Sequence, residues 1–425
     1  MPSATETKDI KTLQEQAHRV IYVIIGHGVI NDRVAKVTKL NIKDSTIVLV
    51  APVATGVAHE EVVVKPYPNP TGLFRFLSLP KFKRTIDHYL FFPSNKILYV
   101  KAVQRVLQKR IHADIKHGKQ VVVLTCVPSH DLCLLGLALK QTFPQIYWMV
   151  DWQDLWSYDE NYFERTPRPY RPSLLRLERR IHRMCDLNVT TNSYAKHVLE
   201  DVYGVPSGRV VAIPHHFSND DLAVSGNDTT NLAQSGKQGV VKIGFLGTLF
   251  KPPRVPGTIV QQALREINAS GVRVELHIHG NFPKHATTES LARMREDGLW
   301  FHGRSNHQDS VRKLMQYDFL LLLLADLPNS RAVMSIKLPH YLSLGIPIIA
   351  VVPEPSAVAN IVMETGAGYV VPINSNWQAQ LGTILRSARA NTSALCRSES
   401  AIQNYSWSNL SKHWIDILIF GRSTS

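Results

Sequence analysis

Short apolar runs alternate with stretches of helical periodicity along most of this 425-residue chain. The runs have the length of strands, and the stretches between them repeat apolar residues every three or four positions. This alternation predicts an α/β fold with mostly parallel sheets. In the first half, the predicted strands are residues 20–25, 46–50, 121–125, 147–150, 187–190 and 210–213. The predicted helices there are residues 33–40, 97–111, 130–141, 174–184 and 193–202.

A polar segment, residues 218–240, interrupts this pattern and has the composition of a linker. The apolar run from Phe319 to Ala325, which follows it, predicts a strand buried on both faces, as parallel sheets require. The sequence thus predicts two Rossmann-like domains, residues 1–217 and 241–400, with a cleft between them and a last segment, 401–425. Strands in the second series are predicted at residues 241–246, 274–279, 299–302, 319–324, 347–352 and 368–371. Its helices are predicted at residues 258–270, 288–297, 307–315, 336–344 and 355–365.

The composition fits a folded protein, with 44% hydrophobic and 19% charged residues. The first apolar run is too short for a secretory signal or a membrane span, and so is the run at Phe319. The four cysteines, Cys126, Cys133, Cys185 and Cys396, lie apart and lack metal-ligand spacing. We therefore expect neither a disulfide framework nor a zinc site, and we expect a cytoplasmic protein.

Positive charge is concentrated in one segment of the chain. The net charge is +14, and residues 65–119 contain 12 Lys and Arg but only two acidic residues, Asp87 and Asp114. Phe and Leu residues lie between these cations. The mixture predicts either peripheral docking on the anionic inner face of the cell membrane or an ordinary solvated basic face. No nucleic-acid-binding module is recognisable, so nucleic acid is not an expected partner.

Two glycines, Gly26 and Gly28, come directly after the first predicted strand. A dinucleotide-binding fingerprint would need a third glycine where Asn31 stands. The pair predicts instead a loop where the backbone can approach a ligand closely. Asn31 or Asp32 is the expected cap of the helix that follows.

A His-Asp turn and an acidic segment follow two neighbouring predicted strands. His130 and Asp131 come after the strand at 121–125, and Asp151 and Asp154 after the strand at 147–150. Open α/β sheets bind ligands at the carboxyl ends of their strands. Side chains of these types can orient or deprotonate sugar hydroxyls, which makes the four residues candidates for catalysis. The family resemblance described below favours this interpretation.

Trp152 and Trp156 lie within the acidic segment. Indole faces can stack on sugar rings, which would place both side chains in the same site. In the alternative interpretation, the tryptophans belong to the core while His130 and Asp131 merely cap a helix.

The second half begins with a pattern that suits a diphosphate. Gly247 follows a strand, Lys251 and Arg254 come next, and a helix is predicted from residue 258. The glycine lets the backbone close in, a helix N-terminus attracts anions, and Arg254 matches phosphate oxygens better than Lys251. We therefore predict a diphosphate-binding site here. We also assign to this site Gly280, which follows the next strand.

The passage 335–349, SIKLPHYLSLGIPII, is the most specific motif in the chain. It resembles the signature Lys-x-x-Glu-Tyr-Leu-x-x-Gly-x-Pro-Ile-Ile of group 1 (family 4-like) retaining glycosyltransferases. The matching residues are Lys337, Tyr341, Leu342, Gly345 and Pro347. The His-Asp turn, the acidic segment and the passage from Gly247 to Arg254 extend the resemblance over most of the chain.

This resemblance implies the GT-B architecture, with the acceptor on the first domain, the donor on the second and a C-terminal helix that returns toward the first. It implies sugar transfer, with retention, from a nucleoside diphosphate sugar to a lipid-linked or polysaccharide-precursor acceptor. Arg254 and Lys337 would neutralise the diphosphate, with Ser335 and His340 beside it. No cofactor and no metal ion are implied.

Two positions depart from the family pattern. The family places a glutamate where His340 stands and another where Ala332 stands. A histidine can still hydrogen-bond a hydroxyl. The departures nevertheless keep two alternatives open, a catalytically inactive GT-B subunit that acts with a protein partner in a transferase complex, and a sugar-nucleotide epimerase.

Overall fold

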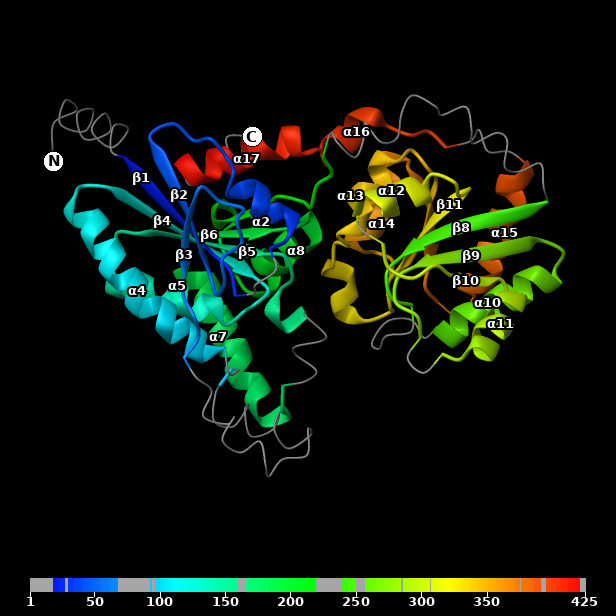
Figure 1. Cartoon of the computed structure of the whole chain (residues 1–425), viewed down its shortest axis with the longest axis horizontal. Coiled ribbons are helices and arrows are strands. Elements are labelled where there is room, and N and C mark those ends of the chain that lie inside the picture. Colours follow the sequence, from blue (N-terminus) through cyan, green and yellow to red (C-terminus); the bar gives the residue numbers. More distant parts are fainter. Residues whose placement is uncertain are drawn as a thin grey trace. The chain divides into compact units, whose positions relative to one another are not determined.

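The computed structural model describes residues 18–26, 30–67, 92–93, 96–158, 166–218, 239–249, 257–283, 286–305, 307–374, 376–390 and 395–420. The chain forms two compact units (Figure 1). Unit 1 comprises Met1–Ile213 and Ser411–Ser425, and unit 2 comprises Pro214–Leu410. The chain therefore passes between the units twice. The polar segment predicted as a linker lies mostly outside the described residues.

Unit 1 is built on a parallel seven-stranded sheet in the order β3-β2-β1-β4-β5-β6-β7. The strands are β1 (Arg19–Ile24), β2 (Ser45–Ala51), β3 (Glu60–Val63), β4 (Gln120–Val127), β5 (Tyr147–Trp152), β6 (Leu187–Thr190) and β7 (Val210–Ala212). Residues of β1, β4 and β5 are almost completely buried, because helices cover both faces of the sheet. The strand order reverses between β1 and β4, which makes this the switch point where such sheets bind ligands.

The helices of unit 1 separate these strands in the chain (Figure 1). They are α2 (Asp32–Val37), α4 (Ile97–Lys116), α5 (Leu132–Thr142), α7 (Arg171–Met184) and α8 (Ser193–His197), which continues as a π-helical turn, Val198–Val202. Asn31 is the cap of α2, because its side chain accepts the Val34 N–H at 2.9 Å. The last helix, α17 (Trp407–Phe420), groups with unit 1 from Ser411 onward.

Unit 2 repeats the plan with a parallel six-stranded sheet in the order β10-β9-β8-β11-β12-β13. The strands are β8 (Val240–Leu246), β9 (Arg273–His279), β10 (Leu299–Phe301), β11 (Phe319–Leu323), β12 (Ile348–Val352) and β13 (Gly368–Pro372). The order reverses between β8 and β11. Phe319 and Leu321 of β11 enter one core cluster, whereas Leu320 and Leu322 enter the other. The strand is therefore buried on both faces, as its sequence predicts.

Helices cover both faces of the unit 2 sheet and make three layers. One core cluster lies beneath α10 and α15, and the other beneath α12, α13 and α14. The helices are α10 (Gly257–Ala269), α11 (Thr288–Glu296), α12 (His307–Leu314), α13 (Lys337–Ser343), α14 (Ala357–Thr365), α15 (Trp377–Ala390) and α16 (Glu399–Gln403). The predicted α/β fold with two parallel-sheet domains is thus confirmed.

Candidate functional site

Two glycines lie at the ends of β8 and β9, next to the switch point of unit 2. Gly247 follows β8 and has a φ of 116°, a conformation that favours glycine. Its N–H donates to the carbonyl oxygen of His279, the last residue of β9, at 2.9 Å. A Cβ on Gly280 would lie 2.0 Å from the carbonyl oxygen of Gly247. The two loops therefore touch backbone to backbone, and no side chain fills the space between them.

Lys337 opens α13 at the same end of the sheet. Its ammonium lies 4.4 Å from the centre of the Phe245 ring, two residues before Gly247. Tyr341, one turn further along α13, accepts the Leu246 N–H through its buried hydroxyl at 3.0 Å. This hydrogen bond ties α13 to the end of β8. The structure therefore brings Lys337 and Gly247, predicted to share a site, to one edge of the sheet.

The other predicted donor residues are less closely defined. The Ser335 hydroxyl accepts the Lys337 N–H at 3.4 Å, and His340 is partly exposed on α13. Ala332, at the second position where the family carries glutamate, is buried. Arg254 lies outside the described residues. Near Gly247, Asn281 donates to the Thr248 hydroxyl at 3.2 Å, an interaction that the sequence did not indicate.

The switch point of unit 1 contains a serine, a lysine and an aspartate. A Cβ on Gly26 would lie 2.8 Å from the Ser129 hydroxyl oxygen, so glycine is needed there for close packing. The Lys96 ammonium donates to the same hydroxyl. Burial lowers the pKa of Lys96, and the nearby negative charge of Asp131 opposes this shift. The structure thus brings Gly26 and Asp131 to one place, whereas Gly28 lies outside the described residues.

His130 is buried beside the same loop. Its Nε2 lies 3.0 Å from the carbonyl oxygen of Asp154, so Nε2–H donates to this oxygen. Its ring stacks on Trp156 with centroids 5.3 Å apart. The predicted residues His130 and Asp154 therefore meet through the backbone of Asp154, not through its carboxylate.

Asp151 has a well-defined partner in Arg33 of α2. The guanidinium donates from Nε at 3.0 Å and from Nη2 at 2.8 Å, a two-pronged contact between side chains that are 2% and 1% exposed. Arg33 also donates to the carbonyl oxygen of Ile213 at 2.8 Å, and Gln153 donates to Asp151 at 3.3 Å. This carboxylate is occupied and shielded from water. The geometry assigns Asp151 a structural role in place of the predicted catalytic one.

The two tryptophans of the acidic segment are core residues. Trp152 and Trp156 are both almost completely buried, so the structure corrects the prediction that they stack on a sugar. The loop that carries Trp156 is held by Glu178, which accepts the Ser157 N–H at 3.1 Å and the Tyr203 hydroxyl at 2.9 Å. Because both indole rings are buried in the core, neither is available to stack on a sugar.

A histidine cluster beside Gly280 was not indicated by any sequence motif. Nδ1 of His277 lies 2.9 Å from Nε2 of His302, whose ring also stacks on His279 at 4.7 Å. His279 is 5% exposed, and its Nε2 lies 2.7 Å from the Tyr317 hydroxyl. Burial lowers the pKa of all three histidines, to about 4 for His279. In the part of the chain that the structure describes, no group of His, Cys, Asp and Glu side chains is arranged to hold a metal ion.

Comparisons with known proteins bear on the fold. No protein-family profile and no curated protein sequence matches the chain. Among solved structures, a glycosyltransferase from Rickettsia africae ESF-5 is similar at 11% identity and a TM-score of 0.58, over 95% of this chain and 98% of that one. Anabaena HepE in complex with UDP is similar at 10% identity and a TM-score of 0.62, over 94% and 99%. The chain has the GT-B fold.

Similarity at this level does not distinguish activities within the fold. The Candida albicans trehalose-6-phosphate phosphatase N-terminal domain is 12% identical, with a TM-score of 0.63 over 95% of this chain and 97% of that one. One fold can host different chemistries. Function must therefore be argued from the residues at the two switch points.

Proposed function

We propose that the protein is a glycosyltransferase that moves a sugar from a nucleoside diphosphate sugar to an acceptor, with retention at the anomeric carbon. The observation that carries this proposal is an arrangement in unit 2, where Gly247 and Gly280 meet backbone to backbone and Lys337 lies over Phe245, two residues before Gly247. A diphosphate needs close backbone approach and positive charge, and this junction offers both. The UDP complex of Anabaena HepE favours uridine diphosphate as the nucleotide.

For this reaction, the protein must position the two substrates and stabilise the charge of the leaving diphosphate. The anomeric C–O bond breaks with its electron pair going to the diphosphate, and the acceptor oxygen forms the new bond. Lys337 and Arg254 would stabilise the negative charge on the departing diphosphate. Such fixed charges act without reorganising during the reaction, so the proposal requires no metal ion.

Replacement of Lys337 tests the donor site. Lys337→Met keeps an unbranched side chain but removes the charge, and should weaken UDP binding by about 1.5–3 kcal/mol. Arg254→Ala should have a similar effect. Arg273→Met, at the opposite end of β9, is the matched control and should bind UDP normally. Calorimetric titration with UDP, GDP and ADP measures this, and unchanged affinity in both site variants would contradict the assignment.

The acceptor site is proposed at the switch point of unit 1. His130 and Asp131 are the residues we expect to orient or deprotonate the acceptor hydroxyl, and the carbonyl oxygen of Asp154 fixes the imidazole. His130→Asn should lower the transfer rate while leaving UDP affinity unchanged, because donor and acceptor residues belong to different units. Loss of UDP binding in this variant would reverse the roles of the units.

A second candidate function is a GT-B subunit that binds but does not catalyse. The observation that favours it is the pair Ala332 and His340 at positions where the family carries glutamate. Incubation of the protein with UDP-sugars separates the candidates. Sugar transfer or hydrolysis supports the enzyme, binding without turnover supports the inactive subunit, and a changed sugar configuration in the recovered donor would indicate an epimerase.

We also propose that unit 1 docks on an anionic membrane. On α4, exposed Lys101, Arg105 and Lys109 recur every four residues and form one stripe, opposite the buried Val103 and Leu107. Each such cation gains about 1 kcal/mol near a charged leaflet. In the described residues, no helix is long and apolar enough to cross a membrane. The basic and aromatic segment before α4 lies outside the described residues.

Vesicle co-sedimentation tests the docking proposal. Parent protein should sediment with anionic vesicles, less so with neutral ones, and binding should fall as salt rises. Reversal of Lys101 and Arg105 to Glu should weaken binding, whereas reversal of the exposed Arg312 and Lys313 on α12 should not. Equal sedimentation with both vesicle types would mean that the stripe is a solvated face and that the acceptor is soluble.

A further inference from the structure

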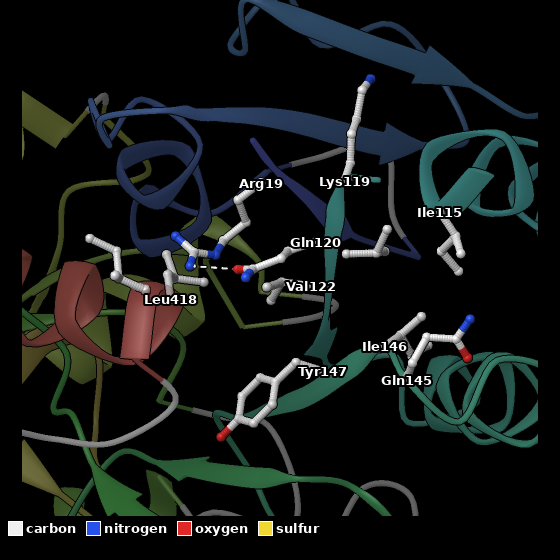
Figure 2. Close-up of a pocket in the computed structure, with 11 residues that line it drawn as sticks. Arg19, Ile115, Lys119, Gln120, Val122, Gln145, Ile146, Tyr147 and Leu418 are labelled. Atoms are coloured by element: carbon white, nitrogen blue, oxygen red, sulfur yellow. Dashed lines mark hydrogen bonds between the residues drawn. The ribbon is translucent and has the colours of Figure 1, made fainter. Parts of the chain in front are cut away.

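A cavity of about 380 Å³ opens in unit 1 at the end of the sheet opposite the switch point (Figure 2). It lies where β1, β4 and β5 begin, at Arg19, Gln120 and Tyr147. A strand of six residues spans roughly 17–20 Å, so this cavity is well separated from the loop at Gly26. Its volume falls within the range of small-molecule pockets. We call it the Arg19 pocket.

One wall of the Arg19 pocket is apolar. Val122 of β4 and Ile146 before β5 supply it from the sheet, and Leu418 and Ile419 supply it from α17. The first three of these side chains are buried in the fold. Figure 2 shows Leu418 facing Arg19 across the opening. A ligand here would rest an apolar body against α17.

The other feature of the pocket is the guanidinium of Arg19. It donates to the Gln120 side-chain oxygen at 2.8 Å, as drawn in Figure 2, and within the described ranges no carboxylate pairs with it. Arg19 is half-buried, and this burial lowers its pKa. A guanidinium has five N–H donors, so a partly desolvated charge with one neutral partner retains donors for an anion.

Lys119, a second cation at the pocket, is already engaged. Its ammonium donates to Asp114 at 2.9 Å, and in Figure 2 its side chain extends away from Arg19 and Gln120. Asp114 in turn accepts the Tyr22 hydroxyl. The two cations therefore differ in availability, although both line the same cavity. Lys119 is thus a matched control for Arg19.

We propose that the Arg19 pocket binds a small amphiphilic anion, with a phosphate or carboxylate head on Arg19 and an apolar chain against the partly exposed Ile115 and Ile419. The planar guanidinium fork matches either head group, and the apolar wall selects for the chain. This site is separate from the proposed donor and acceptor sites. The ligand is a single dispersed molecule, unlike the membrane surface proposed for α4.

A ligand in the Arg19 pocket would also affect the packing of α17 beyond the pocket itself. Trp414 and Leu418 lie four residues apart on one face of this helix. Trp414 packs on the Arg33 guanidinium at 4.7 Å, and Arg33 holds Asp151. A ligand that contacts Ile419, next to Leu418, would therefore stabilise the docked position of α17, the segment with which the chain re-enters unit 1.

Calorimetric titration of the full chain with octyl phosphate, below its critical micelle concentration, tests the proposal. We expect saturable binding of one molecule per chain, and octanoate should compete with it. Inorganic phosphate lacks the chain and octyl glucoside lacks the charge, so each should bind at least about tenfold more weakly. Amides of α17 should exchange more slowly with deuterium when octyl phosphate is bound.

Variants identify the site. Arg19→Gln should weaken octyl phosphate binding roughly tenfold or more, whereas Lys119→Gln should leave it nearly unchanged. Gln145→Glu adds a negative charge at the exposed rim without altering the core, and should weaken binding even if Arg19→Gln folds poorly. Equal affinity for octyl phosphate and octyl glucoside would overturn the proposal. So would unchanged affinity in both Arg19→Gln and Gln145→Glu.

Discussion

The two switch points occupy equivalent positions in their sheets but differ in chemistry. In unit 2, Gly247 and Gly280 remove side chains from the junction and Lys337 stands beside it. In unit 1, His130, Asp131 and Asp151 are buried, and Asp151 is paired with Arg33. The first arrangement suits the ligand site that we propose, whereas in the second the charge of Asp151 is used to hold the fold.

This difference separates two uses of the same strand edge. Charged residues at strand ends can serve a ligand or can fasten a helix to the sheet, and sequence position alone does not distinguish them. Burial and pairing do. An accessible cation beside glycines fits a ligand site, and a shielded two-pronged ion pair fits a structural anchor.

Replacement of Arg33 gives the strongest test of the structural role that we assign to its ion pair with Asp151. Arg33→Met should destabilise the protein by about 3–5 kcal/mol, because Asp151 is left as an unpaired buried charge. The double variant Arg33→Met with Asp151→Leu should recover much of this loss, since no charge is then left unpaired. Urea unfolding measures both. A stable Asp151→Asn variant that nevertheless lost transfer would restore the catalytic interpretation and break the comparison.

The next largest effect is expected at the glycine junction of unit 2. Gly280→Ala places a methyl group against the Gly247 carbonyl oxygen and should cost roughly 1–3 kcal/mol of stability. It should also weaken UDP binding, because the loops must separate. Gly382→Ala on α15 is the control, since a Cβ there meets only ordinary contacts. Normal UDP affinity in Gly280→Ala would show that this glycine junction is not part of the proposed donor site.

A smaller effect is expected from the hydrogen bond that positions α13. Tyr341→Phe removes the acceptor of the Leu246 N–H and should destabilise unit 2 by about 1 kcal/mol. UDP binding should weaken with it, because Lys337 lies on the same helix. Tyr369→Phe, whose hydroxyl makes no hydrogen bond to other described residues, should leave both quantities unchanged. A normal UDP affinity in Tyr341→Phe would show that Lys337 does not depend on this contact.

Most of the fold could be predicted from the pattern of apolar residues. Strong periodicity identified the strands at both switch points to within one or two residues at each end. The short edge strand Glu60–Val63 and the helix Trp377–Ala390 were missed. Three of the four strand residues are at least partly exposed, so no continuous apolar run marks the strand. Edge strands have one neighbour and need less burial, which weakens their signal.

The position of a candidate residue was predictable where it belongs to a short local motif. Gly247 and Lys337 belong to short passages, and the structure places both at one strand edge. The pairing of Arg33 with Asp151 joins residues 118 positions apart, and no local pattern encodes it. In the histidine cluster, His302 follows β10 and meets two histidines of β9, another contact between separate parts of the chain. Contacts of this kind follow from the sheet order, which the sequence leaves open.

The histidine cluster gives the last and smallest test, because His279→Gln should change little at neutral pH. Burial lowers the pKa of His279 to about 4, whereas an unfolded histidine titrates near 6.5. Between these values the unfolded state binds more protons than the folded state, so stability must fall as the pH drops from about 6.5 to 4.

The buried Nδ1 of His279 has no hydrogen-bond partner among the described residues, and Nε2 contacts Tyr317. A glutamine amide can keep the Tyr317 contact but cannot take up the proton. His279→Gln should therefore lose stability less steeply than the parent over that pH range, while His277 and His302 still titrate in both. Urea unfolding at several pH values measures the slopes. Parallel slopes for parent and variant would mean that His279 takes up its proton equally in both states, and that acid does not act on unit 2 through this residue.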